Sequence, residues 1–201
     1  AKIEAWENAL PSYLKLAYLP NPGAVRLRLS SYEVEGESVS KEIERQFEAL
    51  RRIIPHNIIG YETATMQELI HKLLTERRQT LATAESCTGG TIAARFTAMP
   101  GASAYFLCGV VSYSNASKQA VLGVDPDTIA RYGAVSEQVA RQMAEGARRI
   151  SGADYAVSTT GIAGPRRTVA LLKQCGSDRG QIIDRAGAFA LGLLRDELNG
   201  K

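Results

Sequence analysis

The sequence of 201 residues is long enough for one or two hydrophobic cores, and its 45% apolar and 22% charged residues are typical of an ordinary globular protein. The net charge of +3 is too small, and its Lys and Arg residues too dispersed, to indicate a nucleic-acid or membrane partner. The sequence has neither an apolar run that could span a bilayer nor a signal-peptide pattern, so we expect a cytoplasmic protein.

Cysteine and histidine are scarce. The sequence contains Cys87, Cys108 and Cys175, together with His56 and His71. The cysteines are odd in number and lack the paired spacing of a zinc site, so free thiols in a reducing compartment are favoured over disulfides. No paired carboxylates with metal-ligand spacing are visible, and we predict chemistry without a metal or other cofactor.

The N-terminal part predicts a small β–β–α–β unit. Residues 13–19 alternate in part and residues 25–29 alternate strictly between apolar and polar, with Pro-Asn-Pro-Gly as a turn between them. The alternation puts the apolar residues of 25–29 on one buried face. Apolar residues then follow with helical spacing, with Ser38 or Ser40 as the helix cap. Residues 57–61 predict another strand.

Residues 63–78 predict an amphipathic helix. Thr65 and Glu68 have the Thr-x-x-Glu spacing of a capping box. This helix leads into a buried strand around residues 81–83, so we predict a domain boundary near residue 62. His71 lies in the helix, and we expect it to be a surface or packed residue.

Helices and strands alternate after residue 90. Helices are predicted at 91–98, 114–123, 125–133, 136–150 and 178–197, and strands at 106–113, 154–161 and 168–172. The strand 106–113 is mostly apolar and predicted to be buried, Ser114 or Asn115 caps the helix that follows, and Val139, Met143 and Ala147 face inward from theirs. Strands separated by helices predict a layered α/β/α domain with a largely parallel or mixed sheet.

Three loops follow predicted strands at the end where α/β sheets bind their ligands. They comprise residues 85–90, 112–118 and 159–165, and each is rich in Ser, Thr, Asn or Gly. Their coincidence predicts a functional site at this edge of the sheet.

Ser86 lies on the predicted turn between a strand and a helix. Such a turn directs several backbone N–H groups to one point, where an anion or a developing oxyanion is stabilised. Ser86 is therefore a candidate nucleophile. The alternative is that Ser86 or Thr88 only caps the helix.

A serine nucleophile needs a group that takes its proton. Neither histidine lies in a candidate loop, whereas Lys118 lies near a helix start, where partial burial would favour its neutral form. Tyr113 could relay the proton or orient the lysine. The alternative is that Tyr113 packs at the strand end and Lys118 is solvated.

Two neighbours of Ser86 could also carry chemistry. Cys87 is a rival nucleophile, because a thiol at a helix N-terminus can have a lowered pKa. Glu85 could bind a metal or the lysine, or serve as a structural hydrogen-bond acceptor.

Four motifs resemble the C-terminal domain of the competence/damage-inducible CinA family over roughly residues 63–201. They are Ala-Glu-Ser-Cys-Thr-Gly-Gly (84–90), Tyr-Ser-Asn-Ala-Ser-Lys (113–118), Gly-Ala-Val-Ser (133–136) and Thr-Gly-Ile-Ala-Gly-Pro (160–165). The resemblance implies a nicotinamide-nucleotide amidase, which hydrolyses nicotinamide mononucleotide to nicotinate mononucleotide and ammonia. It also implies Ser86, Tyr113 and Lys118 as the catalytic residues.

The same motifs supply the residues that we expect to bind the oxyanion or the nucleotide. Arg179, in a Ser-Asp-Arg segment that resembles a family Gly-Asp-Arg element, is a candidate phosphate ligand. The full set is Cys87, Thr88, Gly89, Gly90, Asn115, Thr160, Gly161, Gly164 and Arg179.

Residues 1–62 resemble the small KH-type domain that, in longer CinA proteins, follows a molybdopterin-binding-like domain associated with ADP-ribose pyrophosphatase activity. We expect that activity not to belong to this chain. Nucleic-acid-binding KH domains use a Gly-x-x-Gly loop, and residues 1–62 contain none, so we predict no nucleic-acid partner.

The alternative to an amidase is a non-catalytic nucleotide-binding or assembly module of a larger CinA-type protein.

The sequence departs from the family pattern after Pro165. The family continues with a glycine-rich loop and a Pro-Val-Gly segment, whereas here Arg166, Arg167 and Thr168 follow at once. Two residues span at most about 7 Å, so we predict an interruption of the chain between residues 165 and 168, where a mobile stretch is omitted. The alternative is a loop that is truly shorter in this protein.

The resemblance implies a homo-oligomer, which we expect to be a dimer. The turn at 99–106 is rich in apolar and small residues, which we predict to be covered in part by another subunit. These residues are Met99, Ala102, Ala104, Tyr105 and Phe106.

Overall fold

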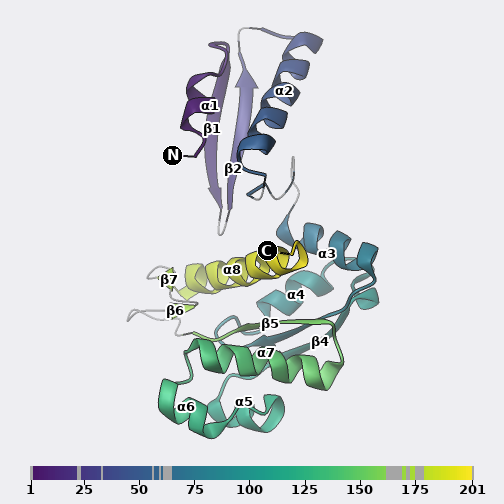
Figure 1. Ribbon diagram of the computed structural model, residues 1–201, viewed down its shortest axis with the longest axis vertical. Helices are drawn as coiled ribbons and strands as arrows, with labels where there is room; N and C mark the ends of the chain where they lie inside the picture. The colour runs from purple at the N-terminus through teal and green to yellow at the C-terminus, as the bar shows by residue number, and fades with distance from the viewer. Residues whose placement is uncertain are drawn as a thin grey trace. The chain divides into compact units, whose positions relative to one another are not determined.

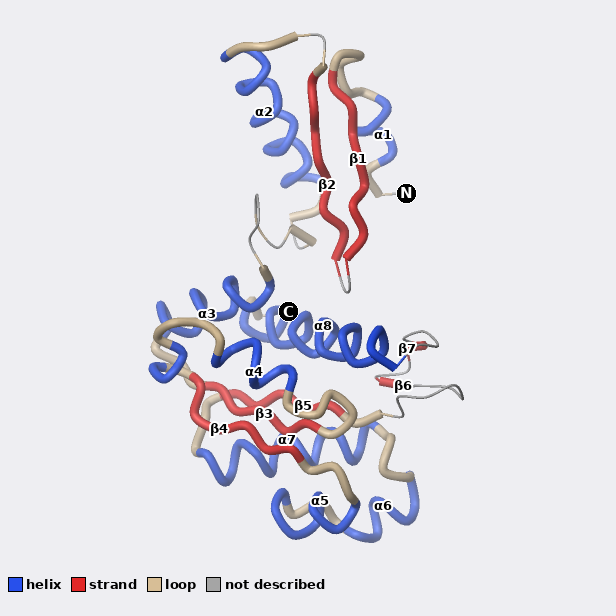
Figure 2. Tube along the Cα trace, turned by 180° about the vertical axis from the view of Figure 1, so that it is seen from behind, coloured by secondary structure: helices blue, strands red, loops and turns tan. Residues whose placement is uncertain are grey.

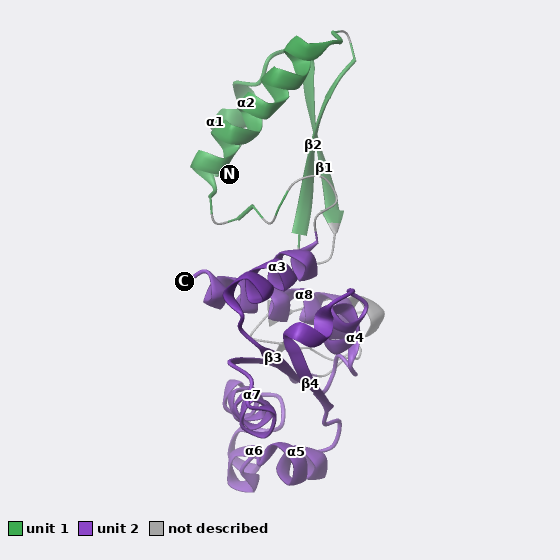
Figure 3. Ribbon diagram, turned by 90° about the vertical axis from the view of Figure 1, so that its right-hand side faces the viewer, with its two compact units in different colours: residues 1–62 green, residues 63–201 purple. Residues whose placement is uncertain are grey.

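The computed structural model describes residues 2–21, 24–32, 34–55, 57–58, 60, 65–161, 169–170, 173–174 and 179–200 (Figure 1). The chain divides into two compact units, Ala1–Glu62 and Thr63–Lys201 (Figure 3).

The described residues of unit 1 form a β-hairpin and two helices. Its elements are α1 (Glu4–Asn8), β1 (Leu14–Asn21), β2 (Ala24–Ser31) and α2 (Glu37–Ile53). The two strands pair antiparallel, as predicted. Leu29 of β2 packs with Trp6 and Leu50 in a small core, whereas Val25, predicted for the same face, is exposed near the start of the strand.

The structure of unit 1 differs from the sequence prediction in three further respects. The short helix α1 was not predicted. The helix α2 begins after Gly36, whose φ of 109° glycine readily adopts, so Ser38 and Ser40 lie within the helix instead of capping it. Asn57, Ile58 and Gly60, the described residues of the predicted strand 57–61, are not in a strand because the β1–β2 ladder does not reach them.

Unit 2 is built on a parallel sheet. Among its described residues, β3 (Leu81–Glu85) lies between β4 (Phe106–Val111) and β5 (Tyr155–Thr159), and both neighbours are parallel to it (Figure 2). Every residue of β3 is buried. The parallel arrangement with covering helices confirms the predicted α/β architecture.

Helices cover both faces of this sheet (Figure 1). On one side lie α3 (Met66–Arg77), α4 (Thr91–Thr97) and α8 (Arg179–Leu198). On the other side lies α7 (Glu137–Ser151), with α5 (Asn115–Leu122) and α6 (Pro126–Tyr132) packed against it. Each of these helices was predicted from the sequence.

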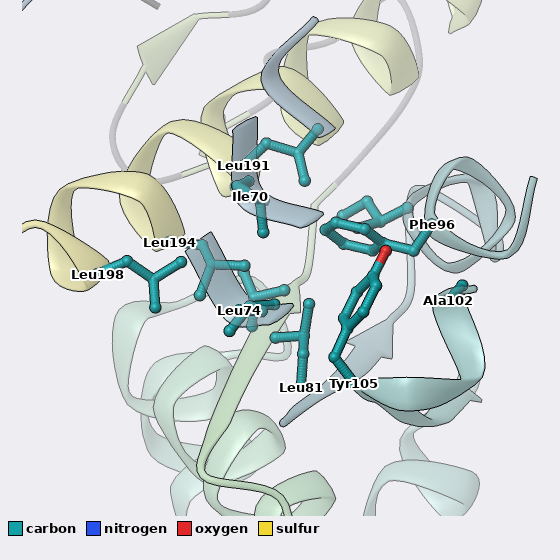
Figure 4. Close-up of a cluster of buried hydrophobic side chains, with 12 residues drawn as sticks. Ile70, Leu74, Leu81, Phe96, Ala102, Tyr105, Leu191, Leu194 and Leu198 are labelled. Atoms are coloured by element: carbon teal, nitrogen blue, oxygen red, sulfur yellow. The ribbon is translucent and has the colours of Figure 1, made fainter. Parts of the chain in front are cut away.

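Each face of the sheet has its own core. On the α3 and α8 side, Leu81 packs with Ile70, Leu74 and Leu191, while the ring of Tyr105 meets that of Phe96 edge to face (Figure 4). On the α7 side, Ala82 and Ala84 pack against other buried residues, including the predicted inward positions Val139, Met143 and Ala147. The small alanines of β3 let α7 approach the sheet closely.

Two capping signals of unit 2 were predicted correctly from the sequence. Thr65 and Glu68 form the predicted capping box at the start of α3. Ser114 caps α5 through a reciprocal pair of hydrogen bonds with Ser117. Both motifs satisfy backbone N–H groups that have no partner within the helix.

The region 99–113 is arranged differently from the prediction. The strand β4 is at the edge of the described sheet, and Leu107 and Val111 on one of its faces are exposed. In the turn before it, which includes the 3-10 helix η1 (Ala102–Ala104), Ala102 and Tyr105 are buried in the chain's own core. Met99 and Phe106 are partly buried and Ala104 is exposed, and coverage of this turn by another subunit stays a prediction.

The predicted core strand 168–172 is also different. Its described part is β6 (Val169–Ala170), which pairs antiparallel with β7 (Lys173–Gln174) in a separate sheet. The predicted interruption between residues 165 and 168 lies outside the described residues. None of the helices in the described part of the chain combines the length and apolar character needed to cross a membrane.

A carboxylate secures the start of β3. Asp154 Oδ2 accepts hydrogen bonds from the backbone N–H and the hydroxyl of Thr80, at 2.7 and 2.8 Å, and these bonds lower the pKa of Asp154. We expect Asp154→Asn to lower the melting temperature by a few degrees at neutral pH. Because the native pKa is the lower one, this stabilisation is complete above the ordinary value of 3.8 and is lost as the pH falls through the native pKa. Melting curves of both proteins should therefore converge in acid, and a constant difference would contradict this.

Candidate functional site

The three candidate loops meet at the carboxyl edge of the parallel sheet, as their positions in the sequence predicted. The backbone N–H of Ser86 donates to the carbonyl of Thr159 at 3.0 Å, and that of Ser112 donates to the carbonyl of Glu85 at 2.8 Å. The sheet ladder thus continues past the end of β3 on both sides, and it holds the loop of the candidate nucleophile between the other two.

Lys118 reaches the candidate nucleophile from α5. Its Nζ lies 3.0 Å from Ser86 Oγ and donates to the carbonyl oxygen of Ser112 at 2.8 Å. Lys118 is only 2% exposed and Ser86 only 6%. The lysine is therefore a buried partner of the serine and not a solvated helix residue.

Burial makes this lysine easier to deprotonate. Burial lowers the pKa of the Lys118 ammonium below its ordinary 10.5, while the nearby Cys87 opposes the shift. A neutral amine has a lone pair that can accept the serine proton. The carbonyl of Ser112 accepts one N–H of Lys118, which orients the amine toward Ser86.

Glu85 is a structural acceptor, one of the roles considered from the sequence. Its carboxylate accepts backbone N–H groups of Gly90 at 3.0 Å, Ile92 at 3.0 Å and Ala93 at 2.8 Å. The start of α4 therefore has no side-chain cap from Ser86 or Thr88. The carboxylate of Glu85 takes the place at this helix end that the sequence analysis assigned to an anion.

The backbone amides of the turn are partly engaged. The N–H of Gly89 donates to the carbonyl of Ser86 at 3.0 Å, and that of Gly90 to Glu85. Two of the amides predicted as oxyanion donors, those of Gly89 and Gly90, therefore already have partners within the turn. Cys87 is buried, and its thiol is not in a disulfide.

Two threonines of the candidate set hold the loops together. Thr88 Oγ1 and Thr159 Oγ1 are 2.6 Å apart, which joins the turn after β3 to the end of β5. Thr160 Oγ1 donates to the carbonyl of Ala134 at 2.8 Å, which ties the 133–136 motif to the same edge. These hydroxyls have structural partners, so a direct role in binding substrate is not required to explain them.

The remaining candidates lie at the margin of the site. Tyr113 is 62% exposed, and its role in relaying the proton or orienting the lysine stays a prediction. Asn115 is exposed and begins α5, while Gly161 is half-buried beyond β5. Gly164 lies outside the described residues. Arg179 is the first residue of α8, and its role as a phosphate ligand stays a prediction.

Sequence reasoning missed Ser112. This residue is completely buried, its carbonyl holds Lys118, and its Oγ has no hydrogen-bond partner among the described residues. The position directly after a strand was a usable signal. Within the same described part of the chain, no three His, Cys, Asp or Glu side chains gather as metal ligands would.

The fold and the site together define the class of protein to which this chain belongs. The protein is an α/β protein with a buried serine–lysine pair at the carboxyl edge of a parallel sheet. The CinA C-terminal domain family matches residues 63–170, which is more than half of the chain. The chain therefore belongs to the CinA family.

Relatives of known sequence and structure agree with this assignment. A CinA-like protein of Flavobacterium psychrophilum is 40% identical over 98% of this chain, and one of Chlorobaculum tepidum is 48% identical over 79%. The crystal structure of the competence damage-inducible protein A of Klebsiella pneumoniae matches 67% of this chain and 95% of its own, with 30% identity and a TM-score of 0.63. That of a competence/damage-inducible protein of Agrobacterium tumefaciens matches 70% and 99%, with 34% identity and a TM-score of 0.61.

The chain spans only part of its longer relatives. It covers 52% of the Flavobacterium protein and 38% of the Chlorobaculum protein. The Flavobacterium alignment extends over 217 positions, more than the 201 residues of this chain, so the relative has residues there that this chain lacks.

Proposed function

We propose that unit 2 is a serine amidohydrolase that converts nicotinamide mononucleotide to nicotinate mononucleotide and ammonia, in pyridine nucleotide salvage. The observation that carries the reaction type is the 3.0 Å contact between Ser86 Oγ and the buried Nζ of Lys118. The substrate comes from the resemblance of the four sequence motifs to the CinA amidases. No step of the reaction requires a metal.

The reaction proceeds in two halves. Neutral Lys118 takes the hydroxyl proton of Ser86 while Oγ of Ser86 attacks the carboxamide carbon. Lys118 then gives that proton to the amide nitrogen, which leaves as ammonia. Water then attacks the resulting ester while Lys118 accepts a proton from it. Cleavage of the ester releases nicotinate mononucleotide and restores the Ser86 hydroxyl with that proton.

The geometry favours Ser86 over Cys87 as the nucleophile, because Nζ of Lys118 contacts the serine oxygen. We expect the wild-type protein to release ammonia from nicotinamide mononucleotide without added metal. Ser86→Ala should lower the rate by about a thousandfold or more, whereas Ser103→Ala, on an exposed serine of the same unit, should not. Ammonia release by Ser86→Ala at the wild-type rate would disprove the assignment, and its loss in Cys87→Ala alone would transfer the role to the thiol.

A non-catalytic nucleotide-binding module is the second candidate. The direct passage from Pro165 to Arg166 and Arg167, where the family has a glycine-rich loop, favours it. Saturable binding of the nucleotide in calorimetry without ammonia release would support this function.

For the rest of the protein we retain the proposals made from the resemblance. Unit 1 is proposed to be a KH-type linker domain without a nucleic-acid partner. The protein is proposed to be a cytoplasmic homo-oligomer, most simply a dimer.

A further inference from the structure

Glu85 occupies an unusual position for a charged side chain. It is the last residue of the central strand β3 and is completely buried. A buried carboxylate is strongly unfavourable unless hydrogen bonds replace its hydration. Here three backbone N–H groups at the start of α4, where the helix dipole is positive, meet the charge at 2.8–3.0 Å.

This carboxylate closes the turn that carries Ser86. At the strand end, the N–H of Ser86 is fixed to the carbonyl of Thr159. At the helix end, the N–H groups of Gly90 and Ile92 both donate to one carboxylate oxygen of Glu85. With both ends of this short turn held, the backbone of Ser86 has one position relative to the sheet.

The backbone of Glu85 also helps to position Lys118, the partner of Ser86. Its carbonyl accepts the N–H of Ser112 at 2.8 Å, and the carbonyl of Ser112 accepts Nζ of Lys118 at 2.8 Å. A shift of Glu85 would therefore move the turn of the nucleophile and the anchor of the lysine at once. The hydrogen bonds form a closed circuit, because Nζ of Lys118 returns to Ser86 Oγ.

We infer that Glu85 is a positioning residue, which sets the distance and direction between Ser86 Oγ and Lys118 Nζ by holding both through hydrogen bonds. This inference rests on the proposed function. Glu85 touches neither reacting group through its side chain, so it is not a catalytic residue. A misplacement of about 1 Å in a reacting pair lowers the rate about a hundredfold.

The competing explanation is that Glu85 acts through its charge on Lys118. In that case its neutralisation would move the pH at which the lysine loses its proton. The causes of the lowered pKa of Lys118 are burial and, in the opposite direction, Cys87. The positioning role therefore predicts a slower reaction with an unchanged pH midpoint.

The test measures the reactivity of Ser86 separately from substrate hydrolysis. A fluorophosphonate probe reacts with an activated serine as the oxygen bonds to phosphorus and fluoride leaves. Mass spectrometry of the full chain gives the number of labelled sites and the rate constant per site across pH. A merely structural role would lower the number of sites, whereas a positioning role lowers the rate constant of each.

Two variants of Glu85 separate the effect of its charge from the effect of its side-chain length. Glu85→Gln keeps the length but removes the charge and places an amide N–H against a backbone N–H, and we expect a rate constant 10 to 100 times lower with the same pH midpoint. Glu85→Asp keeps the charge but is one methylene shorter, and we expect an intermediate rate. Asp154→Asn, at the opposite end of the sheet, removes a carboxylate that also accepts a backbone N–H and should label at the wild-type rate.

A Glu85→Gln rate within about twofold of wild type, or a shift of the pH midpoint, would overturn the inference. If Glu85→Gln yields too little folded protein, the labelling rate of Glu85→Asp is used instead. A wild-type rate in Glu85→Asp would then overturn the inference. Failure of the wild-type protein to hydrolyse nicotinamide mononucleotide while Ser86 is labelled would refute only the proposed substrate. Absence of labelling at Ser86 would refute the nucleophile, and this inference with it.

Discussion

Lys118→Met is expected to lower amide hydrolysis by about a thousandfold and at the same time to raise the melting temperature. Methionine has a similar length but cannot accept the proton of Ser86, whose Oγ lies 3.0 Å from Nζ in the native protein. Lys118→Arg should be equally inactive, because a guanidinium stays protonated. Lys72→Met, the same change on an exposed lysine of α3, serves as the control and should leave the rate unchanged.

The gain in stability follows from the lowered pKa of Lys118. Below the ordinary value of 10.5 the unfolded chain binds a proton on this lysine more readily than the native protein does, so the free energy of unfolding falls as the pH falls through that window. Methionine removes this penalty. Calorimetry at neutral pH should therefore show the inactive variant melting above the wild type. A lower melting temperature would mean that the hydrogen bonds of Lys118 outweigh its desolvation.

The same titration governs the rate. We expect the hydrolysis rate of the wild-type protein to rise with pH as Lys118 loses its proton, with a midpoint below 10.5. A pH profile that is flat across this range would contradict a lysine base.

Gly146→Ala is expected to destabilise unit 2 by about 3 kcal/mol, which corresponds to a melting temperature lower by about 10 °C. A Cβ at position 146 would lie 2.1 Å from the carbonyl oxygen of Leu122 and 2.8 Å from its carbonyl carbon. The helix α7 would have to move away from the end of α5. That movement would also disturb the bond from the guanidinium of Arg149 to the carbonyl of Leu122, 3.0 Å long.

Gly192→Ala is the matched control for this substitution. Gly192 lies within α8, and among the described residues outside its own stretch of helix no atom lies within 4 Å of an added Cβ. Alanine there should stabilise by about 0.5–1 kcal/mol, because it restricts the unfolded chain and favours the helix. Calorimetry should thus give opposite signs for two identical changes, and a stabilised Gly146→Ala would show that α5 and α7 separate without cost. Since α5 carries Lys118, slower hydrolysis should accompany the lower stability.

The features that were predictable depend on residues close together in the sequence. The Thr65 and Glu68 capping box needs only four consecutive residues, and the buried face of α7 needs only helical periodicity. The meeting of the three loops followed from a general property of parallel sheets. Ser86 and Lys118 could therefore be paired before their 3.0 Å contact was known.

The features that were missed depend on which elements pack together. An apolar run such as β4 does not reveal that the strand lies at the edge of the described sheet, where Leu107 and Val111 are exposed. Tyr105 was expected to be covered by another subunit, whereas its ring packs against Phe96 of α4 in the same chain. The sequence does not show that these two segments pack together. The role of Glu85 depends on how α4 is placed after the turn, and Ser112 acts through its backbone, which carries no residue-specific signal.

The central position of β3 also determines when the site can form. Ser86 and Lys118 are both made before β5, yet the backbone of Ser86 is fixed by Thr159 of that strand. A growing chain that has already emerged with both residues therefore still lacks the third strand of the sheet. The hydrogen bond that fixes the backbone of Ser86 can form only once β5 has joined the sheet, so we expect a nascent chain that ends before β5 to lack the aligned pair.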